Sequence, residues 1–316
     1  MTDVAGQLAC FARYAGVIEE LLRRETGETA GALDQAAAAL HLALGLGWQG
    51  GEPATGTSVL PAPDFVAQAS RLWCRCSDAS ALSGGLGTPG VIAAGKKPDA
   101  AGHTRPVYRP LVLHAWVTAL DLMRDTPDDP AVISLHAACE SAAAELANGD
   151  PAGELSAAHG GVVAERAWWA LALFEAGRLF GRLIWVERAM DVLMPLVAGQ
   201  QKSGALLSTT ASDNPETHWY HELVILHALA GYAVRAEDRL AARAVRLATE
   251  FHLGETQPDH ATTQPWGLFA FLWNPATQIL ADGMLHAVRT QHPAGPDPVT
   301  RILLADTLVC LRAYCS

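Results

Sequence analysis

Positive charge is scarce in this chain of 316 residues. Lysine and arginine together number 22, against 33 aspartates and glutamates, so the formal net charge is −11 at pH 7. Proteins that bind nucleic acids need a basic face to neutralise phosphates. The charge balance therefore argues against a nucleic-acid partner. Only three lysines occur, and they lie in stretches that we expect to be loops, at Lys96, Lys97 and Lys202.

Long apolar runs and paired cysteines are also missing. Apolar stretches such as 167–174 are too short and too often interrupted to cross a bilayer. The first ten residues carry neither the basic segment nor the long apolar segment of a secretory signal. The six cysteines include no Cys-x-x-Cys pair. This pattern is typical of reduced cysteines, so we expect a cytoplasmic protein with no membrane partner.

Alanine and leucine dominate the sequence, whereas runs of β-branched or aromatic residues are sparse. This composition favours helices over strands. Apolar residues recur at the i, i+3, i+4, i+7 spacing of a buried helical face. The spacing predicts helices over residues 3–24, 29–46, 62–77, 108–124, 130–147, 161–180, 182–199, 217–234, 236–252, 265–273, 276–291 and 297–315.

The predicted helices repeat in pairs. One helix ends near Gly177 and a similar one ends near Gly231, while Trp116 and Trp168 stand at matching positions of successive pairs. A period of roughly 50 residues is typical of stacked helical hairpins. An open array would need polar capping repeats at its ends, and the sequence shows no such asymmetry. We therefore expect an all-α protein with a single domain over 1–316, folded as an (α/α)6 toroid of six hairpins.

A glycine-rich stretch interrupts this pattern at 78–107. It matches Gly-x-Gly-x-x-Gly between Gly85 and Gly90. A dinucleotide-binding motif also needs a strand before it and a helix after it, and neither is predicted here. We expect a flap over a cavity instead.

Residues 213–222 hold the densest set of proton-handling side chains, with the sequence Asp-Asn-Pro-Glu-Thr-His-Trp-Tyr-His-Glu. Asn214 is a suitable N-cap for the apolar helix that follows, a role that folding alone explains. His218 and Glu222 are four residues apart and share one face of that helix, whereas Tyr220 lies on another. Because folding does not explain the remaining groups, we predict an active site centred on His218.

Histidines also occur in other loops that precede every second helix. His103 and Arg105 precede the helix at 108, His159 precedes the helix at 161, and His260 precedes the helix at 265. In a ring of hairpins these loops meet at one rim. The sequence therefore predicts that these histidines converge with His218.

The other histidines and tryptophans are expected to have mainly structural roles. Histidines inside apolar helical patterns should be hydrogen-bonded core or groove residues, namely His41, His114, His136, His227 and His286. His252 stands near a helix C-terminus, where the helix dipole stabilises a positively charged imidazole. Trp273 is expected in the core, while core packing and ligand stacking remain equally open for Trp219 and Trp266.

A helical toroid with Asn214, His218, Trp219 and Tyr220 at one helix start resembles the helical domains of polysaccharide lyases of the alginate and heparinase types, and the six-hairpin glycosidases. The resemblance covers about residues 60–316. It implies a carbohydrate-active lyase that performs β-elimination on a uronate-containing saccharide in the central cavity. The partner would be a small-molecule or oligosaccharide substrate.

β-Elimination needs a base for the proton α to the carboxylate, a group that neutralises the enolate, and an acid for the leaving oxygen. In this reaction His218 would be the base and Tyr220 the acid. Asn214, His159 and His260 would neutralise the enolate. The substrate-binding residues would be His103, Arg105, Arg166, Trp219, Glu222 and Trp266, with Arg109 as a further partner of the carboxylate.

Three other functions stay open. A metal-dependent hydrolase would use histidines from several loops, with Asp259 or Glu222, to bind a divalent cofactor such as Zn²⁺. A glycoside hydrolase needs two flanking carboxylates, and Glu165, Asp213, Glu216 and Asp259 are available. A helical-repeat scaffold would bind a peptide or sugar without catalysis. The acidic motifs Asp-Asp-x-x-Asp and Asp-x-Asp-Asp are missing, which argues against a terpenoid cyclase.

Overall fold

The computed structural model describes residues 4–24, 32–46, 108–148, 160–208, 215–255, 262, 264–293 and 295–315. Within these residues the chain forms 11 α-helices, one short 3-10 helix (η2, Pro275–Thr277) and no strand. The all-α prediction is therefore confirmed. The helix predicted at 62–77 and the flap predicted at 78–107 lie outside the described residues.

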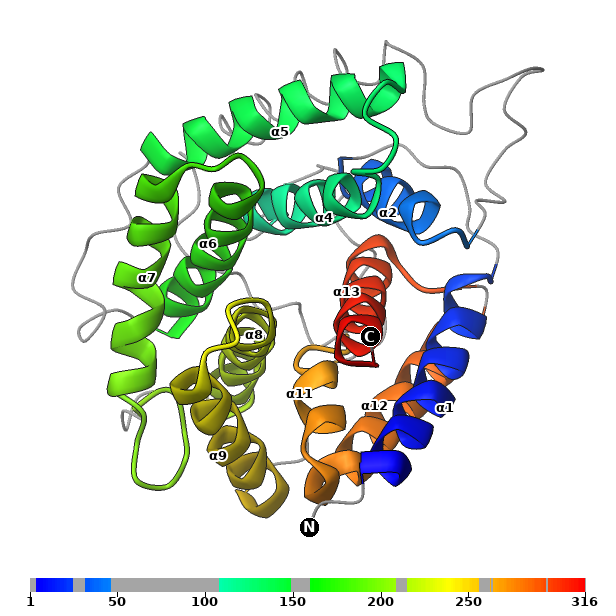
Figure 1. The fold of residues 1–316 in the computed structure, drawn as a ribbon. Helices are drawn as coiled ribbons and strands as arrows, with labels where there is room; N and C mark the ends of the chain where they lie inside the picture. The colour runs from blue at the N-terminus through cyan, green and yellow to red at the C-terminus, as the bar shows by residue number, and fades with distance from the viewer. Residues whose placement is uncertain are drawn as a thin grey trace, which may run out of the picture.

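Six of the helices contact one another in a cycle (Figure 1). α2 contacts α4, α4 contacts α6, α6 contacts α8, α8 contacts α11, α11 contacts α13, and α13 contacts α2. We call these the inner helices: α2 (Ala32–Ala43), α4 (Tyr108–Leu122), α6 (Gly160–Leu179), α8 (Pro215–Arg235), α11 (Leu268–Trp273) and α13 (Pro298–Cys315). Their bounds agree with the predicted ranges to within a few residues.

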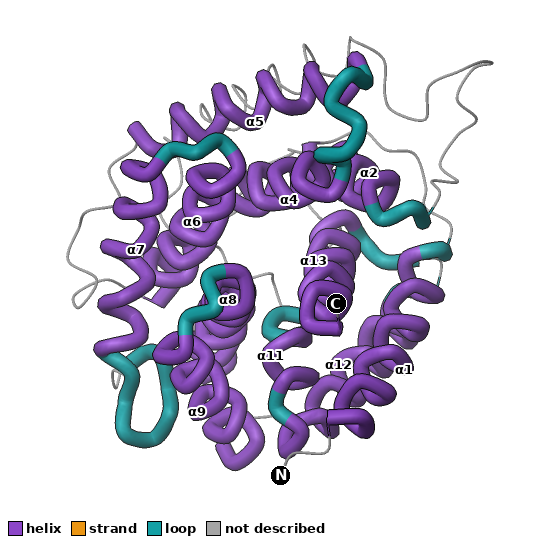
Figure 2. Tube along the Cα trace, viewed as in Figure 1, coloured by secondary structure: helices purple, strands orange, loops and turns teal. Residues whose placement is uncertain are grey.

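The other five α-helices pack around this cycle. α1 contacts α13, α5 contacts α4 and α6, α7 contacts α6, α9 contacts α8, and α12 contacts α11. We call these the outer helices: α1 (Val4–Leu22), α5 (Pro130–Asn148), α7 (Leu183–Ala198), α9 (Arg239–Glu255) and α12 (Gln278–Gln291). Short loops join α4 to α5, α6 to α7 and α8 to α9 (Figure 2). Inner and outer helices thus alternate from α4 to α13, as the pairwise repeat predicts, whereas the residues between the inner helices α2 and α4 lie outside the described part of the chain.

The outer helices bury one face, as α9 shows. Its buried residues follow helical spacing, at Ala241, Ala244, Val245, Ala248, Thr249 and His252. Asp238 begins this helix, because its Oδ1 accepts hydrogen bonds from the N–H groups of Leu240 at 2.8 Å and Ala241 at 3.1 Å. The side chain thereby satisfies two donors that have no partner within the helix.

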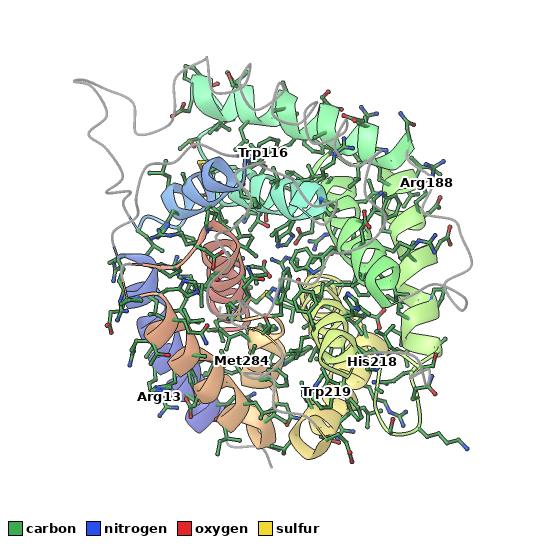
Figure 3. All side chains as sticks on the ribbon, turned by 180° about the vertical axis from the view of Figure 1, so that it is seen from behind. Arg13, Trp116, Arg188, His218, Trp219 and Met284 are labelled. Carbon is green, nitrogen blue, oxygen red and sulfur yellow. The ribbon has the colours of Figure 1, made fainter. Side chains whose placement is uncertain are left out.

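The inner helices are buried on nearly all sides. α6 is buried without interruption from residue 167 to residue 176. It approaches α7 so closely that a Cβ on Gly177 would lie 2.8 Å from Val186 Cγ2, so glycine is needed at this contact. Viewed from behind, side chains fill the centre of the cycle (Figure 3). The largest fully buried side chains are Trp116 of α4, Trp168 of α6 and Trp266, which precedes α11. The centre is therefore a packed core.

Candidate functional site

The start of α8 carries four of the predicted site residues, and three of them are buried: His218, Tyr220 and Glu222. Trp219 is half-buried beside them, and Figure 3 labels it together with His218. Residues 218 and 222 lie one helical turn apart, and His218 Nε2 is 3.8 Å from Glu222 Oε1. The shared helix face predicted for these two side chains is therefore confirmed.

Glu222 holds the connection that follows α7. Its Oε2 accepts a hydrogen bond from the N–H of Leu206 at 2.9 Å, and its Oε1 accepts one from the N–H of Leu207 at 2.6 Å. Burial raises the pKa of Glu222 to about 7, although the two hydrogen bonds favour the carboxylate. This carboxyl group therefore exchanges a proton near neutral pH, next to an imidazole.

A second buried imidazole, His252 of α9, lies near this pair. Burial lowers the pKa of His252 to about 3, and its electrostatic interaction with His218 lowers this pKa further. His252 lies in the last turn of α9, as predicted, but its low pKa leaves the imidazole without the positive charge that the helix dipole would stabilise. The imidazole is neutral because it packs against the rings of Phe251 and Phe271 instead of facing water.

Tyr220 begins a chain of ring contacts that runs into the core. Its ring centroid is 6.3 Å from that of Trp266, which is 5.5 Å from that of Trp168. Trp168 lies 5.3 Å from both His227 and His114. Edge-to-face and tilted pairs at these distances are mutually attractive. The chain connects the start of α8 to a second group of polar residues at the centre of the molecule.

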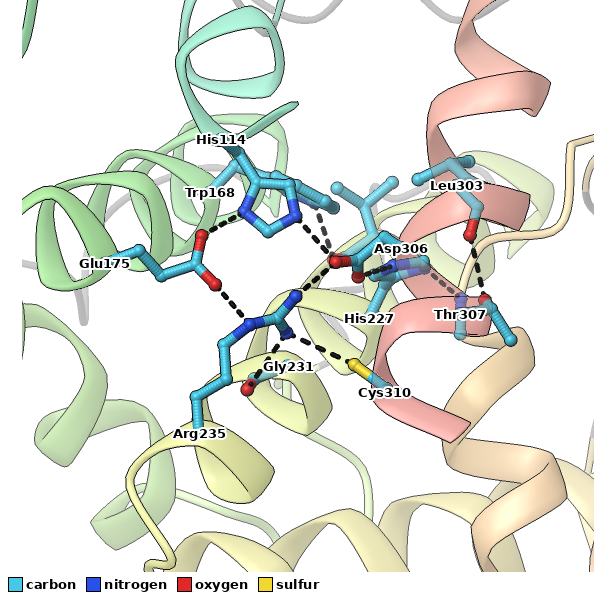
Figure 4. Close-up of polar contacts among 12 residues, drawn as sticks. His114, Trp168, Glu175, His227, Gly231, Arg235, Leu303, Asp306, Thr307 and Cys310 are labelled. Atoms are coloured by element: carbon cyan, nitrogen blue, oxygen red, sulfur yellow. Dashed lines mark hydrogen bonds and ion pairs between the residues drawn. The ribbon is translucent and has the colours of Figure 1, made fainter. Parts of the chain in front are cut away.

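Asp306 of α13 is the centre of this second group, a buried polar network (Figure 4). Its Oδ1 accepts hydrogen bonds from His114 Nε2 at 2.8 Å and Arg235 Nη2 at 2.5 Å. Its Oδ2 accepts one from His227 Nε2 at 3.0 Å. Glu175 contacts the same two cationic side chains at their other nitrogens. It lies 2.5 Å from His114 Nδ1 and forms an ion pair with Arg235 Nε. The network joins α4, α6, α8 and α13.

The hydrogen bonds determine which ring nitrogen of His227 carries the proton. Its Nδ1 accepts a hydrogen bond from the N–H of Gly267 at 3.1 Å, so the proton is on Nε2 and is donated to Asp306. Gly267 has a φ of 75°, in the left-handed region that favours glycine. Burial lowers the pKa of His227, and the charges of His114 and Arg235 add to this effect. His227 is therefore neutral.

The remaining members of the network are charged. Burial alone would lower the pKa of His114, but the carboxylates of Glu175 and Asp306 outweigh it and raise this pKa to about 9. Burial also opposes the charges of Arg235 and Asp306, yet ion pairing keeps the pKa of Asp306 well below its ordinary value and that of Arg235 well above. Two cations therefore face two carboxylates, and the network is neutral as a whole.

A pocket of about 910 Å³ lies next to this network, at the C-terminal ends of the inner helices. The last turns of α4, α6, α8 and α13 line it, together with the start of α9 and Trp273 of α11. Glu175 and Arg235 belong both to the network and to the pocket wall. Trp273 packs against the hydrophobic core, as predicted, but it is only half-buried, and its exposed part lines this pocket.

The structure brings only part of the predicted site together. Tyr220 and Trp266 are in ring contact, and Arg166 is half-buried on α6. Arg109 of α4 pairs with Glu145 of α5 at 2.5 Å, so its guanidinium already has a carboxylate partner. Five predicted residues lie outside the described part of the chain, namely His103, Arg105, His159, Asn214 and His260. The convergence of the loop histidines therefore stays a prediction.

The central network was not predicted as a site, although two of its members were expected to be hydrogen-bonded histidines. His114 and His227 are buried and bonded as predicted. His136 and His286, assigned to the same class, are exposed on the outer helices α5 and α12. The two carboxylates of the network gave a stronger signal. Glu175 is the single carboxylate in the largely apolar run 170–176, and Asp306 is the single one in 302–308. A charge at such a position must find a partner inside the protein.

No protein family, curated protein or solved structure shows significant similarity to this chain. The findings support an all-helical protein, and the likeness to polysaccharide lyases remains a prediction. Among the described residues, no group of three His, Cys, Asp or Glu side chains is arranged to hold a metal ion. In the same part of the chain, no helix is both long and apolar enough to cross a membrane.

Proposed function

We propose that the inner and outer helices form an (α/α)6 toroid. Two observations support this arrangement: the contacts return from α13 to α2, and inner and outer helices alternate from α4 to α13. An open solenoid would leave its first and last repeats without a mutual contact. The sixth outer helix would be the one predicted at 62–77, which lies outside the described residues.

Within this fold, we propose a carbohydrate-active lyase that performs β-elimination on a uronate-containing saccharide at the start of α8. The observation that carries the proposal is the pairing of His218 with the buried Glu222, within one turn of Tyr220. An imidazole beside a carboxyl group and a nearby phenol supply the two proton transfers that elimination requires. A pKa of about 7 for Glu222 also fits a site that works near neutral pH.

In the proposed reaction, neutral His218 takes the proton from the carbon α to the substrate carboxylate. The released electron pair forms a carbon–carbon double bond as the bond to the leaving glycosidic oxygen breaks, and Tyr220 donates its phenolic proton to that oxygen. Glu222, 3.8 Å from His218, stabilises the imidazolium that forms. The groups proposed to neutralise the enolate are Asn214, His159 and His260.

Two alternatives have less support. Metal-dependent hydrolysis would use the same region, but of its proposed ligands only His218 and Glu222 lie in the described residues. In a non-catalytic binding scaffold, Glu222 would have only the structural role of accepting hydrogen bonds from Leu206 and Leu207. No contact in the described residues favours either alternative over elimination.

The test is cleavage of uronate-containing polysaccharides, with alginate, heparin, hyaluronan and polygalacturonate as the panel. Elimination produces an unsaturated uronate that absorbs in the ultraviolet, whereas hydrolysis does not. We expect the His218→Gln variant to lose roughly 100-fold or more in kcat, because the base is removed. The matched control is His41→Gln on α2, which also replaces a buried histidine and should retain activity. Melting temperatures of both variants separate catalytic effects from folding defects.

The outcomes are distinct. If the wild-type protein cleaves none of the four polysaccharides, the lyase proposal fails. If it cleaves one and His218→Gln is as active as His41→Gln, the lyase reading stands but His218 is not its base. Activity that disappears with a chelator and yields saturated products would instead support the metal-dependent hydrolase.

A further inference from the structure

The pocket at the C-terminal ends of the inner helices has a chemical character of its own, and it is separate from the proposed lyase site. It borders residues 233–235 at the end of α8, whereas His218 lies near the start of that helix. At 1.5 Å per residue the two places are roughly 24 Å apart along the helix. The pocket lies near the end of α13, since Ala313 and Tyr314 line it.

Helix dipoles make this pocket electronegative. Four helices end at its wall, namely α4, α6, α8 and α13, and one helix, α9, begins there with its N-terminal N–H groups capped by Asp238. Each helix C-terminus carries unpaired carbonyl groups that are equivalent to about half a negative charge. Because four such ends converge on one pocket, their partial charges act together on whatever occupies it.

The charged side chains of the wall do not reverse this field, because their formal charges cancel. The wall contains Asp121, Glu175, Glu237 and Asp238 against Arg124, Arg178, Arg235 and Arg239. Two of the arginines are bound to the protein itself. Arg235 belongs to the central network, and Arg178 Nη1 donates to the carbonyl of Arg235 at 2.5 Å. Both side chains donate hydrogen bonds to carbonyl groups at the end of α8, namely those of Arg235 and Gly231. These contacts use part of their positive charge within the protein.

Two aromatic rings form one corner of the pocket. Trp273 and Tyr314 have ring centroids 6.1 Å apart and planes inclined at 70°. Each ring is held from outside the pocket, since Trp273 stacks on Phe269 at 5.6 Å and Tyr314 meets the edge of Phe11 at 5.5 Å. Tyr314 is 44% exposed. Two nearly perpendicular aromatic faces are half of the cage that binds quaternary ammonium groups in proteins.

One hydroxyl group in the wall points to a polar ligand independently. Thr118 of α4 is 6% exposed, and its Oγ1 has no hydrogen-bond partner among the described residues. A buried hydroxyl without a partner is costly, because burial removes its bonds to water. Thr118 lines the pocket, so the hydroxyl of a ligand in the pocket is a candidate partner for this group.

We propose that this pocket binds a small organic cation, an amine or quaternary ammonium compound with an apolar body and a hydroxyl group. The converging helix ends attract its charge, the corner of Trp273 and Tyr314 receives its ammonium group, and Thr118 bonds its hydroxyl. The apolar wall, which includes Val117, Leu179 and Val309, contacts the rest. The proposal does not depend on the lyase activity.

The experiment compares three probes of nearly equal shape but different charge. Choline is the cation, 3,3-dimethylbutan-1-ol is its neutral isostere, and 3,3-dimethylbutanoate is the anion. Binding to the full chain is measured by calorimetric titration and by ligand-observed NMR. We expect choline to bind roughly tenfold more tightly than the alcohol, the butanoate to bind most weakly, and added salt to reduce only the binding of choline.

Two pairs of variants locate the site. Trp273→Leu should weaken choline binding severalfold, whereas Trp185→Leu, on the outer helix α7, should not. Glu237→Gln changes an exposed residue of the wall and should weaken binding about twofold without affecting folding, and Glu187→Gln on α7 is its control. A preference for the butanoate would show that the arginines dominate and would overturn the proposal. Equal binding of the three probes, no binding of choline, or an unchanged affinity in Trp273→Leu would overturn it as well.

Discussion

The central network makes a strong prediction for the Asp306→Asn variant. Asp306 accepts hydrogen bonds from three side chains and balances half of the positive charge of His114 and Arg235. An asparagine keeps the shape, but it removes the charge and places an amide N–H₂ opposite N–H donors. Removing one partner from a buried ionic network typically costs about 3–5 kcal/mol. For a chain of 316 residues, a loss of this size lowers the melting temperature by roughly 6 °C.

The same network predicts a dependence on pH. The pKa of His114 is raised from 6.5 to about 9, so the native state holds a proton that the unfolded state releases between these values. The stabilisation is fully present below about pH 6.5 and is lost as the pH rises through about 9. The difference corresponds to about 3 kcal/mol of unfolding free energy. Asp306→Asn removes one of the two carboxylates that raise this pKa, so the alkaline loss should shrink.

Urea unfolding between pH 6 and pH 10, followed by tryptophan fluorescence, measures both effects. Asp191→Asn on α7 is the control, because it replaces an exposed aspartate on an outer helix. If Asp306→Asn does not fold, His114→Gln tests the same argument, since it should remove the alkaline decline. Unfolding free energies that match those of Asp191→Asn at every pH would refute the assigned charges.

Three further changes test other contacts. Because burial raises the pKa of Glu222 to about 7, its contribution to stability is lost as the pH rises from about 4.5 through 7, and Glu222→Gln should flatten this slope in urea titrations. Gly177→Ala should cost about 1–3 kcal/mol, because its Cβ would lie 2.8 Å from Val186 Cγ2. A Cβ on Gly283 would have no atom within 4 Å, so Gly283→Ala should instead stabilise α12 by up to about 1 kcal/mol. Equal melting temperatures for the two alanine variants would contradict the packing argument. Asp238→Ala should lower the unfolding free energy by about 1 kcal/mol, since α9 loses its cap, and an unchanged value would rule out that role.

Local sequence patterns predicted the helices well because helix formation depends on neighbours in the chain. α5 begins at Pro130, as predicted, and α13 begins at Pro298, one residue after its predicted start. The side chain of Asp297 caps α13 through the N–H groups of Val299 and Thr300. The proximity of His218 and Glu222 was predictable for the same reason, because it follows from the pitch of one helix.

Exposure was harder to predict than helix position. His252 was read as a cation at the end of a helix, but its ring packs between Phe251 and Phe271. Trp273 was read as a core residue, and it packs against the core, but its exposed part lines a pocket. In both cases the helical pattern gives the face of the side chain. It does not give the distance from that face to the next helix.

By itself, the sequence determined the helical class, the bounds of the helices and the pairs of residues that share one helical turn. Only the tertiary structure decided that His114, Glu175, His227, Arg235 and Asp306 meet in one network. Asp306 and His114 are separated by 192 residues. No local pattern encodes such a contact, because it depends on the cycle of inner helices that brings α13 back to α4. The pocket follows from the same cause, since four helix ends line it only after the helices have packed side by side.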